Sequence, residues 1–225
     1  MLDRHDLVRL APEGWDQALA GLSGAAAALA ADWRARDLPA VARRLEPGTP
    51  PAMVCLGMPA PPDPHTGQKL RVGLKVRRGS IVAIRPPLAL HEAEVPAPWQ
   101  PAFAELRDAM SGAGIECRVF GSVAMQTITG ERYLGPASDI DLLLRPSSAA
   151  QLDAGLDLLV RYARHLPLDG EIAFPSAQAV SWKEWLAAAQ PERHGGARVL
   201  TKHLDTVALV RCDALLGQFG GGAHG

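Results

Sequence analysis

Two carboxylates in the middle of the chain have a spacing that could bind a metal ion. Asp139 and Asp141 stand at i and i+2 at the start of an apolar run, residues 140–144, which predicts a β-strand. Alternate side chains of a strand point to the same face, so the two like charges should lie side by side and repel unless a cation neutralises them. Oxygen-only ligands favour Mg²⁺ or Mn²⁺, held jointly with phosphate groups of a substrate.

A glycine–serine pair upstream could bind those phosphates. Gly121 and Ser122 follow a strand predicted at residues 116–120 and precede a helix predicted at residues 123–129. The free backbone N–H groups of a helix start can bind an anion. The pair and the two aspartates together therefore predict a metal site that faces a phosphate-binding turn.

A third carboxylate is expected from residues 168–174, which predict another strand. Asp169 and Glu171 share the i, i+2 spacing, and either could complete the site as a metal ligand or a general base. We prefer Asp169 and retain Glu171 as the alternative. Three carboxylates could hold one or two metal ions that bridge a triphosphate and activate an attacking hydroxyl. Catalysis of this kind rests on positioning and charge neutralisation.

Each of these signals also has a structural explanation. Asp-x-Asp at a strand end is common, and Gly-Ser is a two-letter pattern, so either one alone is more often structural than catalytic. The order of strand, Gly-Ser, helix, Asp-x-Asp strand, helix and carboxylate-bearing strand is much harder to obtain by chance.

The elements that must position these residues fall into two parts. Residues 16–36 are alanine-rich and predict one helix capped by Asp16, and residues 40–90 contain short apolar runs separated by proline and glycine turns, as in a small β-rich unit. The proline-rich residues 94–99 indicate a domain boundary. We therefore expect a helix and β-rich domain at 1–95, a catalytic domain at 96–217 and a disordered tail at 218–225.

In the catalytic part, helices alternate with strands, which favours an α+β fold with a mixed sheet and flanking helices. Capping-box patterns predict helices that open at Ser148 and Ser181, and residues 197–202 and 206–211 predict a hairpin.

Composition narrows the range of partners. The 225 residues are 48% apolar with a net charge of −1, so no global basic field favours nucleic acid. A basic run at residues 69–78 predicts either a solvated strand face or a local phosphate patch. Three widely spaced cysteines are typical of free thiols in a reducing compartment, and no apolar run reaches the roughly 18 residues that span a bilayer. We expect a soluble, cytoplasmic protein without a membrane partner.

The order of elements resembles the DNA polymerase β-like nucleotidyltransferase superfamily. The stretch at residues 121–143 further resembles the malonate decarboxylase holo-acyl-carrier-protein synthase family, also called phosphoribosyl-dephospho-CoA transferases. The matching residues are Gly121, Ser122, Gln126, Thr129, Gly130, Tyr133, Leu134, Ser138, Asp139, Asp141, Leu142 and Leu143. The likeness extends more weakly over residues 40–216.

The resemblance implies a specific reaction. A serine of the malonate decarboxylase acyl-carrier subunit would attack the α-phosphorus of triphosphoribosyl-dephospho-CoA, and pyrophosphate would leave. Gly121 and Ser122 would hold the departing phosphates, with Gln126 and Arg118 nearby, although the side on which Arg118 lies is open. Asp139 and Asp141 would hold Mg²⁺, and Asp169 or Glu171 would activate the serine. Lys202 would either neutralise phosphate charge or be an ordinary surface lysine.

Three other hypotheses remain open from the sequence. The chain could be a different nucleotidyltransferase, a non-catalytic module that binds a carrier protein or CoA, or a structural subunit in which the Asp-x-Asp pair is merely solvated.

Overall fold

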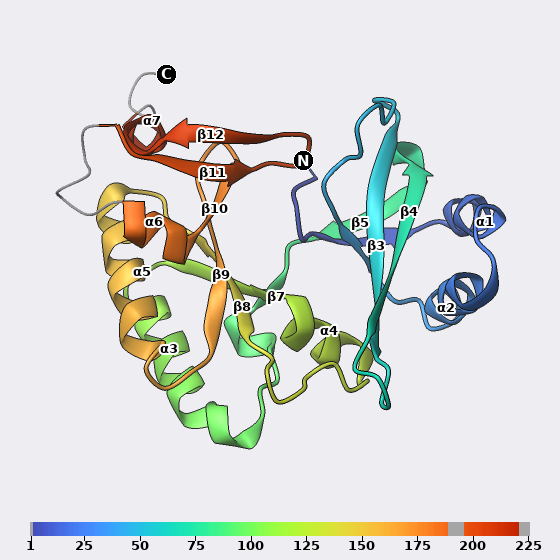
Figure 1. Cartoon of the computed structure of the whole chain (residues 1–225), viewed down its shortest axis with the longest axis horizontal. Coiled ribbons are helices and arrows are strands. Elements are labelled where there is room, and N and C mark those ends of the chain that lie inside the picture. The colour runs from blue at the N-terminus through green and yellow to red at the C-terminus, as the bar shows by residue number, and fades with distance from the viewer. Residues whose placement is uncertain (1, 189–195, 221–225) are drawn as a thin grey trace. The chain divides into compact units, whose positions relative to one another are not determined.

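The structure, a computed structural model, describes residues 2–188 and 196–220 and divides into two compact units (Figure 1). The first unit comprises Met1–Pro87, Ile128–Tyr133 and Leu204–Thr206; the second comprises Leu88–Thr127, Leu134–His203 and Val207–Gly225. The first continuous segment of the first unit ends at Pro87 rather than near residue 95, because Leu88 and Ala89 already pair with a strand of the second unit's sheet.

The first unit contains a five-stranded antiparallel sheet with the order β4-β3-β2-β1-β5. Its strands are β1 (Leu7–Leu10), β2 (Ala40–Ala42), β3 (Met53–Pro62), β4 (Lys69–Arg77) and β5 (Ile81–Arg85), with a 3₁₀ turn η1 at Arg78–Ser80. The helices α1 (Pro12–Ala20) and α2 (Gly24–Ala35) contact β4 and β3. The β-rich character predicted for residues 40–90 is confirmed, whereas β1 was not predicted.

The single helix predicted at residues 16–36 is wrong, because the chain forms two helices there. Gly24 has a φ of +55°, in the left-handed region that favours glycine, and Ser23 is extended, so the helical hydrogen bonds are interrupted between α1 and α2. Asp16 does not cap a helix but lies within α1, where its Oδ1 accepts a hydrogen bond from Arg34 of α2 at 2.6 Å.

The charged side chains of β4 lie on an edge strand. Val72, Leu74 and Val76 are buried, whereas the alternating Lys69, Arg71, Lys75 and Arg77 are exposed. Lys75 forms an ion pair with Glu46 at 2.5 Å. This alternation is what a solvated strand face predicts.

The second unit contains a seven-stranded sheet with the order β12-β11-β10-β9-β8-β7-β6. The strands are β6 (Leu88–Ala89), β7 (Glu116–Phe120), β8 (Ile140–Arg145), β9 (Leu168–Ala173), β10 (Ala179–Ser181), β11 (Arg198–Lys202) and β12 (Val207–Arg211). Strands β8 and β9 are parallel, and the other pairs are antiparallel. The predicted α+β class with a mixed sheet is therefore confirmed.

Two helices, α3 and α5, lie side by side along one face of this sheet (Figure 1). The α-helices of the unit are α3 (Gln100–Gly112), α4 (Gly121–Thr129), α5 (Ala149–Tyr162), α6 (Trp182–Ala188) and α7 (Cys212–Leu216), with 3₁₀ turns η2 (Leu90–Glu92), η3 (Ala97–Trp99) and η5 (Gly217–Phe219). The predicted cap of α5 is present, since Ser148 Oγ accepts a hydrogen bond from Gln151 N at 3.1 Å. A Cβ at Gly155 would lie 2.8 Å from Leu144 Cδ2, so α5 packs directly on β8.

The segment predicted as a disordered tail begins inside η5. Gln218 Oε1 accepts a hydrogen bond from Ser176 N at 3.1 Å, and the ring of Phe219 packs 5.7 Å from that of Phe174. Residues 221–225 lie outside the described part of the chain. Within the described ranges, no helix has the length and apolar character needed to cross a bilayer.

Candidate active site

The parallel pairing of β8 with β9 places two of the predicted carboxylates side by side. In the register, Asp141 is opposite Asp169, and Ile140 is opposite Leu168. Paired residues of adjacent strands project to the same side, with the strands about 4.8 Å apart. Asp139 precedes β8 by one residue and, by strand alternation, is expected on the side of Asp141. The structure therefore brings Asp141 and Asp169 together at the start of two neighbouring strands.

Gly121 lies against Asp141. It directly follows β7, whose last residue, Phe120, is paired with Asp141. Gly121 has a φ of +68°, and a Cβ built on it would lie 1.8 Å from Asp141 Oδ2, so a side chain here would strain the backbone and displace the Asp141 carboxylate. Ser122 follows in the first turn of α4, which begins two residues earlier than predicted. The phosphate-binding turn expected from the sequence thus directly contacts one of the carboxylates.

The other candidate for the third carboxylate is engaged by a lysine. Glu171 is only 6% exposed, and its Oε1 accepts a hydrogen bond from Lys202 Nζ of β11 at 3.0 Å. A buried carboxylate needs such a partner, because desolvation of an unpaired charge is costly. Lys202 is therefore more than a solvated surface lysine, and it holds Glu171 two residues beyond Asp169 on the same side of the sheet.

A second lysine, Lys183, contacts Asp169 and was missed by the sequence analysis. Its Nζ lies 3.4 Å from Asp169 Oδ1, which also accepts a hydrogen bond from Gly170 N at 2.9 Å. The capping-box motif from Ser181 to Glu184 correctly predicted a helix that begins after Ser181, and Glu184 Oε1 accepts a hydrogen bond from Leu200 N of β11 at 2.6 Å. The sequence signal that could have indicated Lys183 is its position in the first turn of the helix that directly follows β10.

The donor atoms suit a hard cation, although the third ligand is not arranged in advance. Within the described ranges, no three His, Cys, Asp or Glu side chains are placed to hold a metal ion. Asp169 is instead paired with Lys183. Magnesium is commonly bound by one or two carboxylates and completed by substrate phosphates and water, and Asp139 with Asp141 matches that requirement.

Two further predicted residues have visible structural partners. Arg118 lies on the side of the sheet that carries Asp141, and its Nε donates a hydrogen bond to Glu116 Oε1 at 2.6 Å. Gln126 Oε1 accepts a hydrogen bond from Leu134 N at 3.2 Å and so holds the start of the segment that leads to Asp139. Substrate binding by Arg118 and Gln126 remains a prediction.

Three residues of the family resemblance, Thr129, Gly130 and Tyr133, belong to the first unit. Arg36 Nη2 donates a hydrogen bond to Thr129 O at 2.6 Å, and its Nη1 lies 3.2 Å from Glu131 Oε1. Tyr133 is 2% exposed and donates its hydroxyl proton to Pro59 O at 2.8 Å. Burial raises the pKa of Tyr133 to about 12, so the phenol remains a neutral donor. These contacts anchor the segment within the first unit.

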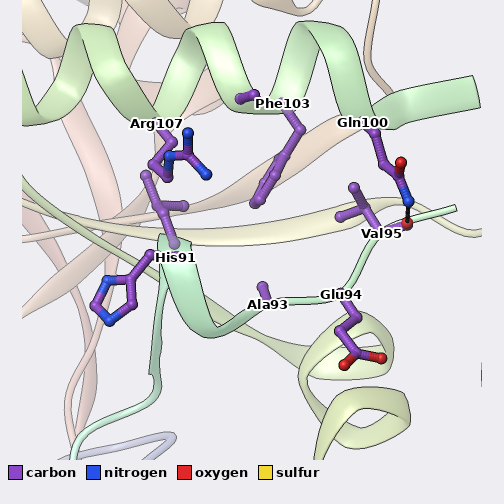
Figure 2. Close-up of a pocket in the computed structure, with 9 residues that line it drawn as sticks. His91, Ala93, Glu94, Val95, Gln100, Phe103 and Arg107 are labelled. Atoms are coloured by element: carbon purple, nitrogen blue, oxygen red, sulfur yellow. Dashed lines mark hydrogen bonds between the residues drawn. The ribbon is translucent and has the colours of Figure 1, made fainter. Parts of the chain in front are cut away.

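A cavity of about 390 Å³ lies between α3 and the segment that contains η2 (Figure 2). Leu90, Val95 and Phe103 supply apolar surface, and His91, Glu94 and Arg107 supply polar groups. None of the predicted site residues lines it. The predicted carboxylates of β8 and β9 thus lie outside this cavity.

Comparisons with known proteins identify the family of this chain. Residues 3–87 match the family model for the phosphoribosyl-dephospho-CoA transferase MdcG N-terminal domain, and residues 87–213 match the model for its C-terminal domain. A phosphoribosyl-dephospho-CoA transferase of Xanthomonas campestris pv. campestris (strain 8004) is 36% identical over 210 residues, which cover 90% of this chain and 95% of that protein. One from Bradyrhizobium diazoefficiens is 32% identical over 213 residues, covering 92% and 89%. No solved structure gives a significant match. The chain belongs to the phosphoribosyl-dephospho-CoA transferase family and is a transferase.

Proposed function

We propose that this enzyme transfers the phosphoribosyl-dephospho-CoA prosthetic group from its triphosphate precursor to a serine of the malonate decarboxylase acyl-carrier subunit. The serine Oγ forms a bond to the α-phosphorus, the bond from that phosphorus to the bridging oxygen breaks, and pyrophosphate leaves. The observation that carries the proposal is the contact of Gly121 with Asp141, which is itself in register with Asp169. Family membership supports the choice of substrate.

Gly121 and Ser122 hold the phosphates that leave. Backbone N–H groups at the start of α4, together with the Ser122 hydroxyl, donate hydrogen bonds to phosphate oxygens. Asp139 and Asp141 would hold Mg²⁺ or Mn²⁺. When bound, the cation neutralises the charge that develops on the leaving pyrophosphate.

Asp169 is the residue to which we assign activation of the acceptor serine. Its side chain is 40% exposed, whereas the side chain of Glu171 is 7% exposed and held by Lys202. Asp169 can therefore reach an incoming hydroxyl more easily than Glu171 can. Lys183 and Lys202 add positive charge on the side of the sheet from which the polyphosphate approaches.

We place this reaction in the cytoplasm. Cys55, Cys117 and Cys212 are free thiols, which supports a reducing compartment. Burial raises the pKa of the Cys117 thiol to about 12, so it does not act as a nucleophile in the reaction.

Pyrophosphate release provides the test. With the triphosphate precursor, Mg²⁺ and the carrier subunit, the enzyme should release pyrophosphate, while ATP and other nucleoside triphosphates should give little. Asp139→Asn and Asp141→Asn should each lower kcat by about 10²-fold or more with folding preserved, because each weakens charge stabilisation in the transition state. Asp157→Asn, at an exposed position on α5, is the matched control and should leave the rate unchanged.

Two results would contradict the proposal. A nucleoside triphosphate used in preference to the precursor would indicate a different nucleotidyltransferase. Full function in both the Asp139→Asn and the Asp141→Asn variant would indicate a binding module in which the Asp-x-Asp pair has no catalytic role.

A further inference from the structure

The outer hairpin of the second sheet exposes apolar side chains. Strand β12 is the edge of the sheet, and its Val207 and Leu209 are 41% and 61% exposed, while Leu200 of β11 is 38% exposed. An exposed edge strand with apolar side chains is a template for association, and native proteins usually protect it with charge, proline or a covering element. Strand β12 has no charged residue before Arg211.

These three side chains form one continuous surface, which we call the hairpin patch. Leu200 is paired with Leu209, and Lys202 is paired with Val207, so the apolar residues are direct or diagonal cross-strand neighbours. On the opposite side of β11, Val199 is 0% exposed and Thr201 is 1% exposed. Strand β11 is therefore packed on one side and exposes an apolar side chain on the other, whereas in strand β12 the side chain of Ala208 is also exposed and that of Val210 is half-buried.

The hairpin patch continues from the proposed active site. Lys202, which binds Glu171, is on the same strand as Leu200 and on the same side of it. Ala179 of β10 is paired with Lys202 of β11 on one side and with Ala173 of β9 on the other. Paired residues project to the same face of the sheet, so Lys202 lies on the face of β9 that carries Asp169 and Glu171. From strand spacings of about 3.3 Å per residue and 4.8 Å between strands, the Leu209 Cα lies about 8 Å from that of Lys202.

We propose that the hairpin patch is the docking surface for the acceptor protein, an inference that rests on the proposed function. A protein that presents its serine to the Asp169 side chain must cover the neighbouring surface, and the hairpin patch is the apolar part of that surface. The exposed Arg198 borders it at one end and Lys202 at the other, so the partner should present apolar side chains flanked by carboxylates near the acceptor serine. Among the described residues, β12 pairs with β11 alone, so its outer backbone edge can also pair with an extended segment of that partner.

Steady-state kinetics with the carrier subunit as the varied substrate test this inference. Leu209→Glu places a carboxylate in the hairpin patch and should raise KM for the carrier at least about tenfold, which corresponds to 1.4 kcal/mol of binding. The value of kcat and the KM for the triphosphate precursor should stay within about twofold. Val82→Glu on β5, a position that is 64% exposed at the edge of the other sheet, is the matched control and should change neither KM.

A second variant tests the contribution of the positive charge of Arg198, at the start of β11, to carrier binding. Arg198→Glu should raise the carrier KM several-fold, with an effect that shrinks as ionic strength rises. Circular dichroism and the unfolding midpoint check that both variants fold, which their exposed positions predict.

Each outcome bears on a different claim. If the unmodified enzyme transfers the group and Leu209→Glu leaves the carrier KM within twofold, the docking inference is wrong and the proposed function stands. If the unmodified enzyme modifies no carrier, the proposed function fails and the docking inference fails with it. If Leu209→Glu instead dissociates a dimer in light scattering without altering the carrier KM, the hairpin patch joins two copies of this chain, which also overturns the inference.

Discussion

Replacing Gly121 with alanine should separate stability from catalysis. The added Cβ would lie 1.8 Å from Asp141 Oδ2 and 2.7 Å from Asp141 Cγ, well inside van der Waals contact. The Asp141 side chain can move because it is flexible, whereas the backbone at Gly121, with a φ of +68°, is held between β7 and α4. Gly121→Ala should therefore displace the carboxylate without preventing folding.

The expected cost has two parts. An alanine in the left-handed region costs about 1–2 kcal/mol relative to glycine. Moving Asp141 away from its preferred rotamer adds about 0.5–1.5 kcal/mol. The free energy of unfolding should thus fall by about 1.5–3.5 kcal/mol. Since a misplacement of about 1 Å at a reacting centre can lower a rate 10²-fold, transfer should fall by about that factor.

Gly114→Ala is the matched control for this substitution. Gly114 belongs to the same unit and has a φ of +65°, but the atom nearest to a Cβ built on it is Gln151 Nε2 at 3.9 Å, an ordinary contact. The Gly114→Ala variant has only the cost of placing an alanine at a positive φ, so its rate of transfer should equal that of the unmodified enzyme. Urea unfolding and pyrophosphate release measured on both variants provide the comparison. If Gly121→Ala is as active as Gly114→Ala, Gly121 does not position Asp141 for the reaction.

Three further predictions concern ion pairs and hydrogen bonds. Lys202→Met leaves the buried Glu171 without its lysine and should lower the free energy of unfolding in urea by about 2 kcal/mol; adding Glu171→Gln should restore most of it, and no recovery would contradict the pairing. Hydrogen bonds from Lys75 and then Arg43 lower the pKa of Glu46 from 4.5 to about 2, so its stabilising effect is fully present above pH 4.5 and lost as the pH falls through 2. The unfolding midpoint of Glu46→Gln should therefore lie below that of the unmodified chain at pH 6 and converge with it near pH 2, whereas a constant difference would argue against this assignment. Tyr133→Phe removes the hydrogen bond to Pro59 O and should lower the free energy of unfolding by about 1 kcal/mol, and an unchanged value would show that this contact does not stabilise the first unit.

The carboxylates and the glycine turn could be predicted because their signals are local. Strand alternation and the apolar run after Asp139 locate β8, and the spacing of Asp169 and Glu171 indicates that both lie on one side of β9. The sequence could not choose between these two, because the choice depends on burial and on Lys202, which lies far along the chain.

Other features depend on contacts between distant segments. The role of Thr129 and Tyr133 becomes clear only when Arg36 and Pro59 of the first unit are placed beside them. Lys183 was missed because it lies on helix α6, whereas its partner, Asp169, lies on strand β9. The break between α1 and α2 was missed because alanine has the highest helix propensity, and that preference hid the conformation of Gly24.

The intact mass of the carrier subunit tests the central claim most directly. After incubation with the enzyme, Mg²⁺ and the triphosphate precursor, the carrier should gain the mass of one phosphoribosyl-dephospho-CoA group on a serine. The gain should disappear when that serine is replaced by alanine and when the enzyme carries Asp141→Asn. A carrier of unchanged mass after incubation with the folded, unmodified enzyme would contradict the account.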